Sequence, residues 1–110
     1  MWSKEKIQDW YDDHKWLVGC NYLPSSAINQ LEMFQEDSFD ADTNKREVGW
    51  ARDVGFNSLR IYLHDLLWQD KKNFKKRLNE ILTLCADHNI KPILVLFDDC
   101  HRPFPKLGKQ

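Results

Sequence analysis

Residues 57–64 read NSLRIYLH, and this stretch decides between the folds that the chain could adopt. Leu59, Ile61 and Leu63 alternate with polar and aromatic side chains, which is the spacing of a β-strand with one apolar face. Arg60 belongs to the other face. In an open sheet covered by helices on both sides, Arg60 would be buried under a helix. In a closed barrel it would point toward the mouth, so the stretch favours a barrel.

Two other strands are predicted around this one. Residues 16–22 (WLVGCNY) form a short apolar run that ends in polar groups before Pro24, which indicates strand one. Residues 92–97 (PILVLF) are apolar on both faces, as strands of buried parallel sheets are, and indicate strand three. Residues 57–64 are then strand two, followed by an expected loop at residues 65–70.

Helices are predicted from apolar side chains at helical spacing and from capping residues. They cover about residues 3–14, 24–34, 43–54 and 71–88. Ser3 caps the first, and a Pro-Ser-Ser sequence at residues 24–26 starts the second. In the third helix Val54 is expected to point inward, and Gly55 is expected to end the helix in a left-handed conformation. Asn89 is expected to end the fourth helix in the same way.

The alternation of strands and helices predicts an α/β fold. Helices of this length cross back over the sheet, so the strands are expected to be parallel, with right-handed connections. An open doubly wound sheet and an eight-stranded barrel both fit this order. A barrel takes about 250 residues, whereas the chain has 110. We therefore predict a partial (β/α)8 TIM barrel, in which residues 1–110 form the first three parallel strands with their helices.

Polar side chains gather where the predicted strands end, which is where parallel α/β folds collect their functional groups. They are Asn21 and Tyr22 at the end of strand one, His64 and Asp65 at the end of strand two, and Asp98, Asp99 and His101 at the end of strand three. Each residue also has an ordinary structural interpretation, such as capping a turn. The sequence therefore predicts a binding site at this edge of the sheet.

Arg60 is harder to explain by structure alone, because a guanidinium inside an apolar strand is expected to be buried. A buried cation needs an anionic partner. Asp98 and Asp99 are the carboxylates expected nearby, and a carboxylate from a further strand is the other candidate.

Several classes of function find little support in the sequence. Sixteen basic and seventeen acidic residues are interspersed, with a net charge of −1, so we expect no nucleic-acid surface. No Gly-rich phosphate loop is present, and the polar residues at 98–101 lack the spacing of a zinc site. We expect no cofactor and no metal. Three cysteines, an odd number, are expected to be reduced thiols.

No apolar stretch approaches the roughly 18 residues of a membrane span, and the N-terminus lacks the apolar core of a signal peptide. No membrane partner is therefore expected, and the compartment stays open. Five tryptophans are many for this length. They serve either as large core residues or as platforms on which sugar rings stack.

Four stretches together resemble the start of cellulase- and xylanase-like barrel proteins. They are WLVGCNYLP at 16–24, EMFQ at 32–35, NSLRIYLHDLLW at 57–68 and VLFDDC at 95–100. Such proteins are of the glycoside hydrolase family 5 type, within the clan that shares the eight-fold barrel. The resemblance covers nearly the whole chain, and residues 55–60 (GFNSLR) are its most specific part.

The resemblance implies retaining hydrolysis of a β-glycosidic bond, which needs two carboxyl groups about 5–5.5 Å apart. In the family these are glutamates after strands four and seven, so both positions are expected beyond Gln110. Arg60 would match the family's arginine on strand two, which supports the nucleophile by keeping it ionised.

The resemblance also implies which residues line the sugar site. Asp98, Asp99 and His101 are the candidates after strand three, although the spacing of the histidine departs from the family's pattern. His64, Asp65 and Trp68 would line a subsite by position. Xylan, glucan, mannan and host glycans all remain candidate substrates, and relatives of this type are often exported.

Two alternatives stay open. The chain could be a non-catalytic module that binds carbohydrate or associates with itself, or an unrelated small α/β domain with an open three-stranded sheet. A sheet of three barrel strands would leave two edges and an inner face without partners. Such edges pair readily with another chain, so self-association is expected.

Overall fold

The described part of the chain comprises residues 1–96, 98 and 103–110 of a computed structural model, and it contains one parallel sheet with its helices. In chain order the elements are α1 (Lys4–Asp12), β1 (Gly19–Asn21), α2 (Gln30–Phe34), α3 (Ala41–Asp53), β2 (Ser58–Tyr62), the 3₁₀ helix η1 (Asp65–Asp70), α4 (Lys71–Asp87) and β3 (Lys91–Val95).

The sheet has the order β1-β2-β3, and both pairs of neighbouring strands are parallel. This confirms the predicted parallel α/β arrangement. Asn21 is in register with Arg60, and Arg60 with Ile93, so the three side chains share one face of the sheet. The strands are shorter than predicted, and residues 65–70, expected as a loop, form η1 and lead directly into α4.

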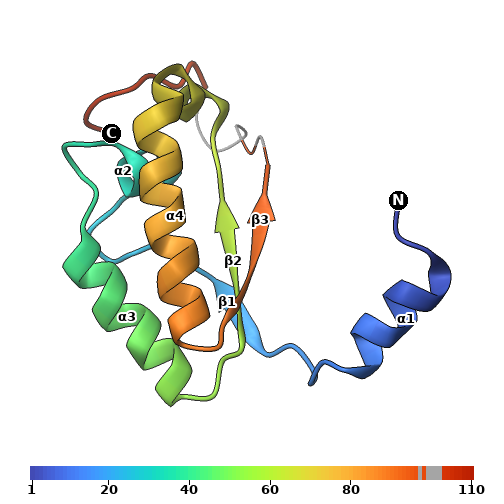
Figure 1. Cartoon of the computed structure of the whole chain (residues 1–110). Coiled ribbons are helices and arrows are strands. Elements are labelled where there is room, and N and C mark those ends of the chain that lie inside the picture. Colours follow the sequence, from blue (N-terminus) through green and yellow to red (C-terminus); the bar gives the residue numbers. More distant parts are fainter. Residues whose placement is uncertain (97, 99–102) are drawn as a thin grey trace.

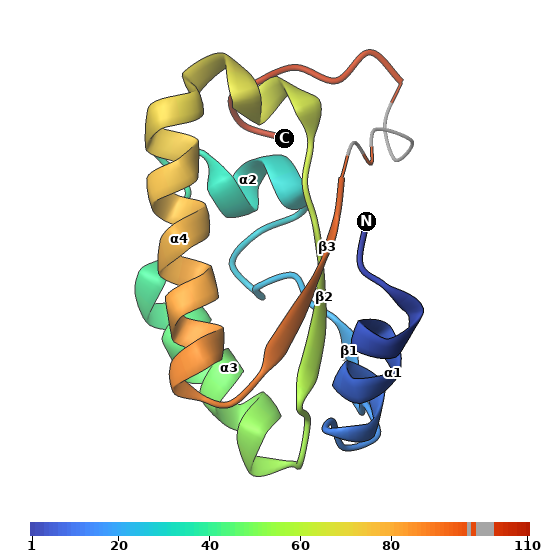
Figure 2. The ribbon, with the colours of Figure 1, turned by 45° about the vertical axis from the view of Figure 1, so that its right-hand side comes forward.

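Helices α2, α3 and α4 all cover the same face of the sheet, as Figures 1 and 2 show. Leu59 and Ile61 of β2 are fully buried on that face. Helix α1 lies apart from the sheet, and no residue of it is buried. In the described part of the chain, no helix covers the other face. Helices on one face only are compatible with the first units of a barrel.

One prediction about β3 is wrong, because the described residues leave one face of the sheet uncovered. The strand was expected to be buried on both faces, but Ile93 is 49% exposed. The physical reason is that only the face toward α4 has a covering layer among the described residues. Both faces of β3 are therefore apolar, but the described residues cover only one of them.

Helix α1 starts at its predicted cap, and α3 starts at a cap of the same kind. The hydroxyl of Ser3 accepts a hydrogen bond from the backbone N–H of Lys6. The carboxylate of Asp40 accepts one from the N–H of Thr43 and so caps α3. This bond to the Thr43 N–H, the largest cause, lowers the pKa of Asp40. Local capping chemistry therefore sets these helix starts.

Helix α2 begins later than predicted. Its cap is Asn29, whose side-chain oxygen accepts from the backbone N–H groups of Leu31 and Glu32. The Pro-Ser-Ser sequence instead forms a turn, in which the N–H and hydroxyl of Ser25 donate to the carboxylate of Glu47 on α3. A tertiary contact therefore overrides the local helix-start signal.

The left-handed residues are confirmed at Gly55, with φ of 96°, and at Asn89, with φ of 56°. Val54 was predicted to point inward, which is wrong, because the residue is 73% exposed. Helix α3 ends at Asp53, so Val54 no longer follows the helical stripe. Cys85 lies free in the core, and burial raises the pKa of its thiol to about 11.

Gly19 allows β1 to approach β2 closely. A β-carbon at this position would lie 1.8 Å from the backbone oxygen of Ser58. No side chain fits there without separating the two strands. The glycine therefore allows the start of β1 to lie this close to β2.

Candidate functional site

A pocket of about 330 Å³ opens at the carboxyl ends of β1 and β2. Its walls come from the end of both strands and from the chain that leads into α2. They comprise Asn21, Tyr22, Leu23, Ile28, Asn29, Gln30, Met33 and Tyr62. This is the edge of a parallel sheet where ligands bind in α/β proteins.

Each side of the pocket is placed by a separate element. Asn21 is the last residue of β1 and Tyr62 the last residue of β2. Asn29 and Gln30 are the cap and the first residue of α2. All of the polar lining groups are uncharged amides or phenols. Amide side chains both donate and accept hydrogen bonds, so they suit ligands rich in hydroxyl groups.

Arg60 lies beside this pocket, in register with Asn21 and with its guanidinium carbon 4.8 Å from the centre of the Tyr62 ring. The prediction that Arg60 is buried is wrong, because it is exposed on the uncovered face. Within the described residues it forms no ion pair with a carboxylate, Asp98 included. A cation that remains in water needs no such partner.

Tyr22 enters the core on the helix side of the sheet. Its hydroxyl donates to the side-chain oxygen of Asn44, 2.8 Å away, and burial, helped by the nearby Glu47, raises the pKa of Tyr22 above its ordinary range. The side-chain nitrogen of Asn44 is buried without a partner among the described residues. The hydroxyl of Tyr22 is thus engaged inside the protein, and its assignment to a sugar site stays a prediction.

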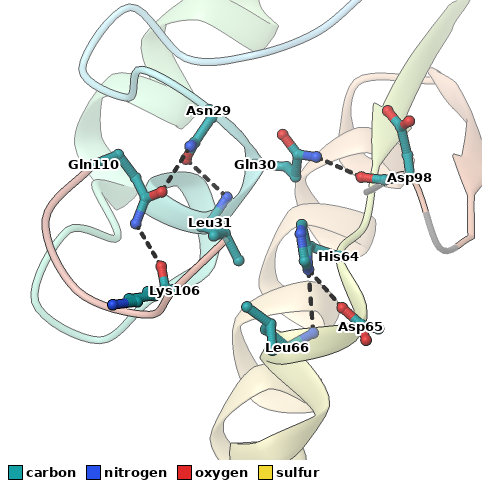
Figure 3. Close-up of polar contacts among 9 residues, drawn as sticks. All are labelled: Asn29, Gln30, Leu31, His64, Asp65, Leu66, Asp98, Lys106 and Gln110. Carbon is teal, nitrogen blue, oxygen red and sulfur yellow. Dashed lines mark hydrogen bonds and ion pairs between the residues drawn. The ribbon is translucent and has the colours of Figure 1, made fainter. Parts of the chain in front are cut away.

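His64 and Asp65 lie together at the start of η1 (Figure 3). Atom Nδ1 of the buried His64 is 2.8 Å from a carboxylate oxygen of Asp65 and 3.2 Å from the backbone nitrogen of Leu66. Without a proton, Nδ1 accepts from the Leu66 N–H. With a proton, it donates to Asp65. Asp65 and the Leu66 N–H are therefore alternative partners of the same ring nitrogen. Neither His64 nor Asp65 lines the pocket.

Asp98 follows β3 and is held through its backbone. Its N–H donates to the carbonyl of Leu63, 3.1 Å away, and its carbonyl accepts from the side chain of Gln30 at 2.7 Å (Figure 3). The structure thus joins the end of β3 to a residue of the pocket. The predictions for Asp99 and His101 lie outside the described residues.

Trp68 is directed toward α4. Its ring meets that of Phe74 edge to face, with centroids 6.4 Å apart, and Lys75 places its ammonium 5.0 Å from the ring centroid. Trp68 is not among the residues that line the pocket. A role in sugar binding stays a prediction for it.

Three polar residues of the pocket were missed in the sequence: Asn29, Gln30 and Tyr62. Tyr62 carried a signal, since it alternates with the apolar residues of β2 and ends the strand. Asn29 carried another, because Asn before an apolar helix start is a good cap. Gln30 carried no signal in the sequence, because its contact with Asp98 joins residues that are far apart in the chain.

Metal ligands do not gather in the part of the chain that the structure describes, where no three His, Cys, Asp or Glu side chains lie close enough to share an ion. None of the helices among those residues combines the length and apolar character that a bilayer crossing requires.

No protein-family model and no curated protein matches the chain. Among solved structures, the chain is similar to part of exo-beta-1,4-mannosidase Op5Man5 from Opitutaceae bacterium strain TAV5. The TM-score is 0.56 and the sequence identity 23%, over 74% of this chain. The matched part covers 15% of the mannosidase chain. At this level of identity, the likeness establishes a shared fold.

Proposed function

We propose that the chain is the N-terminal portion of a glycoside hydrolase-like barrel that acts on β-linked polysaccharide or oligosaccharide. The placement of Asn21 and Arg60 carries the proposal, because the two lie in register beside a pocket at the carboxyl edge of a parallel sheet. The fold likeness to a β-mannosidase supports it. The uncovered face of the sheet would then be the inside of the barrel.

The pocket suits a neutral sugar ring. Its volume of about 330 Å³ lies at the lower end of the range of about 300–1,000 Å³ typical of small-ligand sites. Asn21 offers its amide to hydroxyl groups, and Gln30, whose side-chain nitrogen donates to Asp98, offers its side-chain oxygen. Tyr62 offers an aromatic ring to the apolar face of a sugar. We assign Asn21, Gln30 and Tyr62 to sugar binding.

Arg60 would act on the reaction through a carboxylate supplied from outside the described residues. Its exposed guanidinium on the uncovered face is available for a charge-assisted pair with a nucleophilic carboxylate. Such a pair lowers the pKa of the carboxyl group and keeps it ionised. Residues 1–110 alone are expected to bind sugar without cleaving it.

The test is a titration of the chain with β-linked mannobiose, cellobiose and xylobiose, followed by amide NMR. We expect the amide signals of Asn21, Gln30 and Tyr62 to shift with at least one of these sugars. The Asn21→Ala variant should weaken this response, whereas Asn73→Ala, an exposed position on α4, should not. If none of the β-linked sugars shifts these signals more than α-linked maltose does, the proposal fails.

One observation favours a second function, a non-catalytic module that associates with itself. Leu17 and Ile93 are exposed and line one shallow depression together with Arg60 on the uncovered face. Parallel sheets are normally covered on both faces. A second copy of the chain would cover this apolar surface, and sedimentation measurements distinguish this state from a monomer.

A further inference from the structure

Two consecutive residues at the start of α2, its cap and its first residue, contact two distant parts of the chain. The side-chain nitrogen of Asn29 donates to the side-chain oxygen of Gln110 at 3.0 Å, and that of Gln30 donates to the carbonyl of Asp98 at 2.7 Å (Figure 3). The start of α2 therefore connects the end of β3 with the C-terminal residues.

Asp98 is fixed from both sides of its peptide backbone. Its N–H bonds to Leu63 just after β2, and its carbonyl bonds to Gln30 on α2. Gln30 is itself buried, so its amide has little freedom to turn away. The position of the Asp98 side chain at the sheet edge thus depends on an amide that lies far from it in sequence.

Residues 106–110, here called the strap, lie along one face of α2. The backbone N–H of Gln110 donates to Glu32 at 3.1 Å. The side chain of Gln35 exchanges two hydrogen bonds with the backbone of Gly108, at 3.0 and 2.6 Å. Gly108 has a φ of 104°, which favours glycine. Asn29, Glu32 and Gln35 follow one another at helical spacing, so one helix face holds the strap.

We propose that Gln30 is a positioning residue that sets the place of Asp98 at the mouth of the sugar site, and that the strap holds α2 where Gln30 reaches Asp98. The role of Asp98 toward sugar rests on the proposed function. The placement of Asp98 by Gln30 does not, so the two can fail separately.

The placement is tested without any sugar, by amide hydrogen exchange in the Gln30→Met variant. Met keeps the size of the side chain and removes its hydrogen-bond donor. The loss of one hydrogen bond corresponds to a change of about five- to tenfold in the exchange rate. We therefore expect the Asp98 amide to exchange about fivefold faster. Gln8→Met on exposed α1 is the matched control and should leave Asp98 unchanged.

A second variant, Gln30→Glu, tests the donor itself. At neutral pH its carboxylate cannot donate to the Asp98 carbonyl, so exchange at Asp98 should be fast. Once protonated, near or below the ordinary glutamate pKa of about 4.3, the acid can donate again. Exchange at Asp98, measured relative to the native chain at the same pH, should then return toward the native value. A purely packing role for Gln30 would give no such recovery.

The strap is tested with Gln110→Ala, because Gln110 does not line the pocket. We expect this variant to speed exchange at Asp98 and to weaken mannobiose binding several-fold. Unchanged exchange at Asp98 in both Gln30→Met and Gln110→Ala would overturn the proposal. Faster exchange at Asp98 in the two variants, with no response of the native chain to mannobiose, would support the placement of Asp98 by Gln30 and reject the proposed function.

Discussion

Asn21 and Arg60 lie side by side on neighbouring parallel strands. They belong to the face of the sheet that no helix covers in the described part of the chain (Figure 1). Asn21 also lines the pocket at the strand ends, and Arg60 extends over the ring of Tyr62, which lines it too. A neutral pocket and a solvated cation therefore adjoin each other. This juxtaposition is the basis of the proposed sugar chemistry.

Replacement of Arg60 by Met should change the free energy of unfolding by less than about 1 kcal/mol. The side chain is exposed, and its contact with Tyr62 is of a kind that contributes about 0.5–1 kcal/mol at exposed sites. Urea unfolding measures the change. A loss of about 3–5 kcal/mol would instead indicate a buried ion pair formed with another chain or segment.

The Gly19→Ala variant should separate β1 from β2 and destabilise the fold by more than about 2 kcal/mol, within the range of severe single substitutions. The added carbon would lie 1.8 Å from the Ser58 oxygen, which belongs to the backbone and cannot turn aside. Gly49→Ala is the control, since its nearest neighbour is His88 at 3.9 Å. There, in the middle of α3, alanine should stabilise by about 0.5–1 kcal/mol. Equal effects at both positions would contradict the observed approach.

The Tyr22→Phe variant should lower the free energy of unfolding by about 1–3 kcal/mol, because it leaves the buried Asn44 without its hydroxyl partner. A second change, Asn44→Leu, removes the other polar group and should recover part of the loss. Thermal or urea unfolding of the two variants tests this. A double variant less stable than Tyr22→Phe alone would argue against the buried pair.

The raised pKa of Tyr22 also predicts a pH dependence. Its folded pKa exceeds the unfolded value of about 10. The stabilisation is therefore fully present below pH about 10 and declines as the pH rises above that value. The native chain should lose stability in this alkaline range more steeply than Tyr22→Phe does. Parallel pH profiles for the two proteins would exclude the effect.

The uncovered sheet face predicts self-association of the isolated chain. Ile93→Lys should shift sedimentation toward the monomer, because it places a charge among the apolar side chains of that face. Val54→Lys, at an exposed apolar position after α3, is the matched control and should leave sedimentation unchanged. A native chain that stays monomeric at high concentration would contradict the prediction.

Much of the local structure was predictable because its causes lie close together in sequence. The alternation around Leu59 and Ile61 placed β2, and Ser3 and Asp40 cap their helices through neighbouring N–H groups. Gly55 and Asn89 end helices because they tolerate a left-handed backbone. Such signals act over a few residues and need no knowledge of the rest of the molecule.

The site depended on contacts that no local pattern encodes. Asn21 and Tyr22 were predicted from their place at the end of a strand, but tertiary packing decides that Asn21 lines a pocket and that the Tyr22 hydroxyl bonds to Asn44. Gln30 gained its role only through Asp98, 68 residues away.

The sequence by itself determined the order of strands and helices, because hydrophobic periodicity and capping are local. Only the tertiary structure decided that α2, α3 and α4 share one face and that Arg60 stays in water on the other. The physical reason is that burial depends on what covers a surface, and covering layers come from residues distant in the chain.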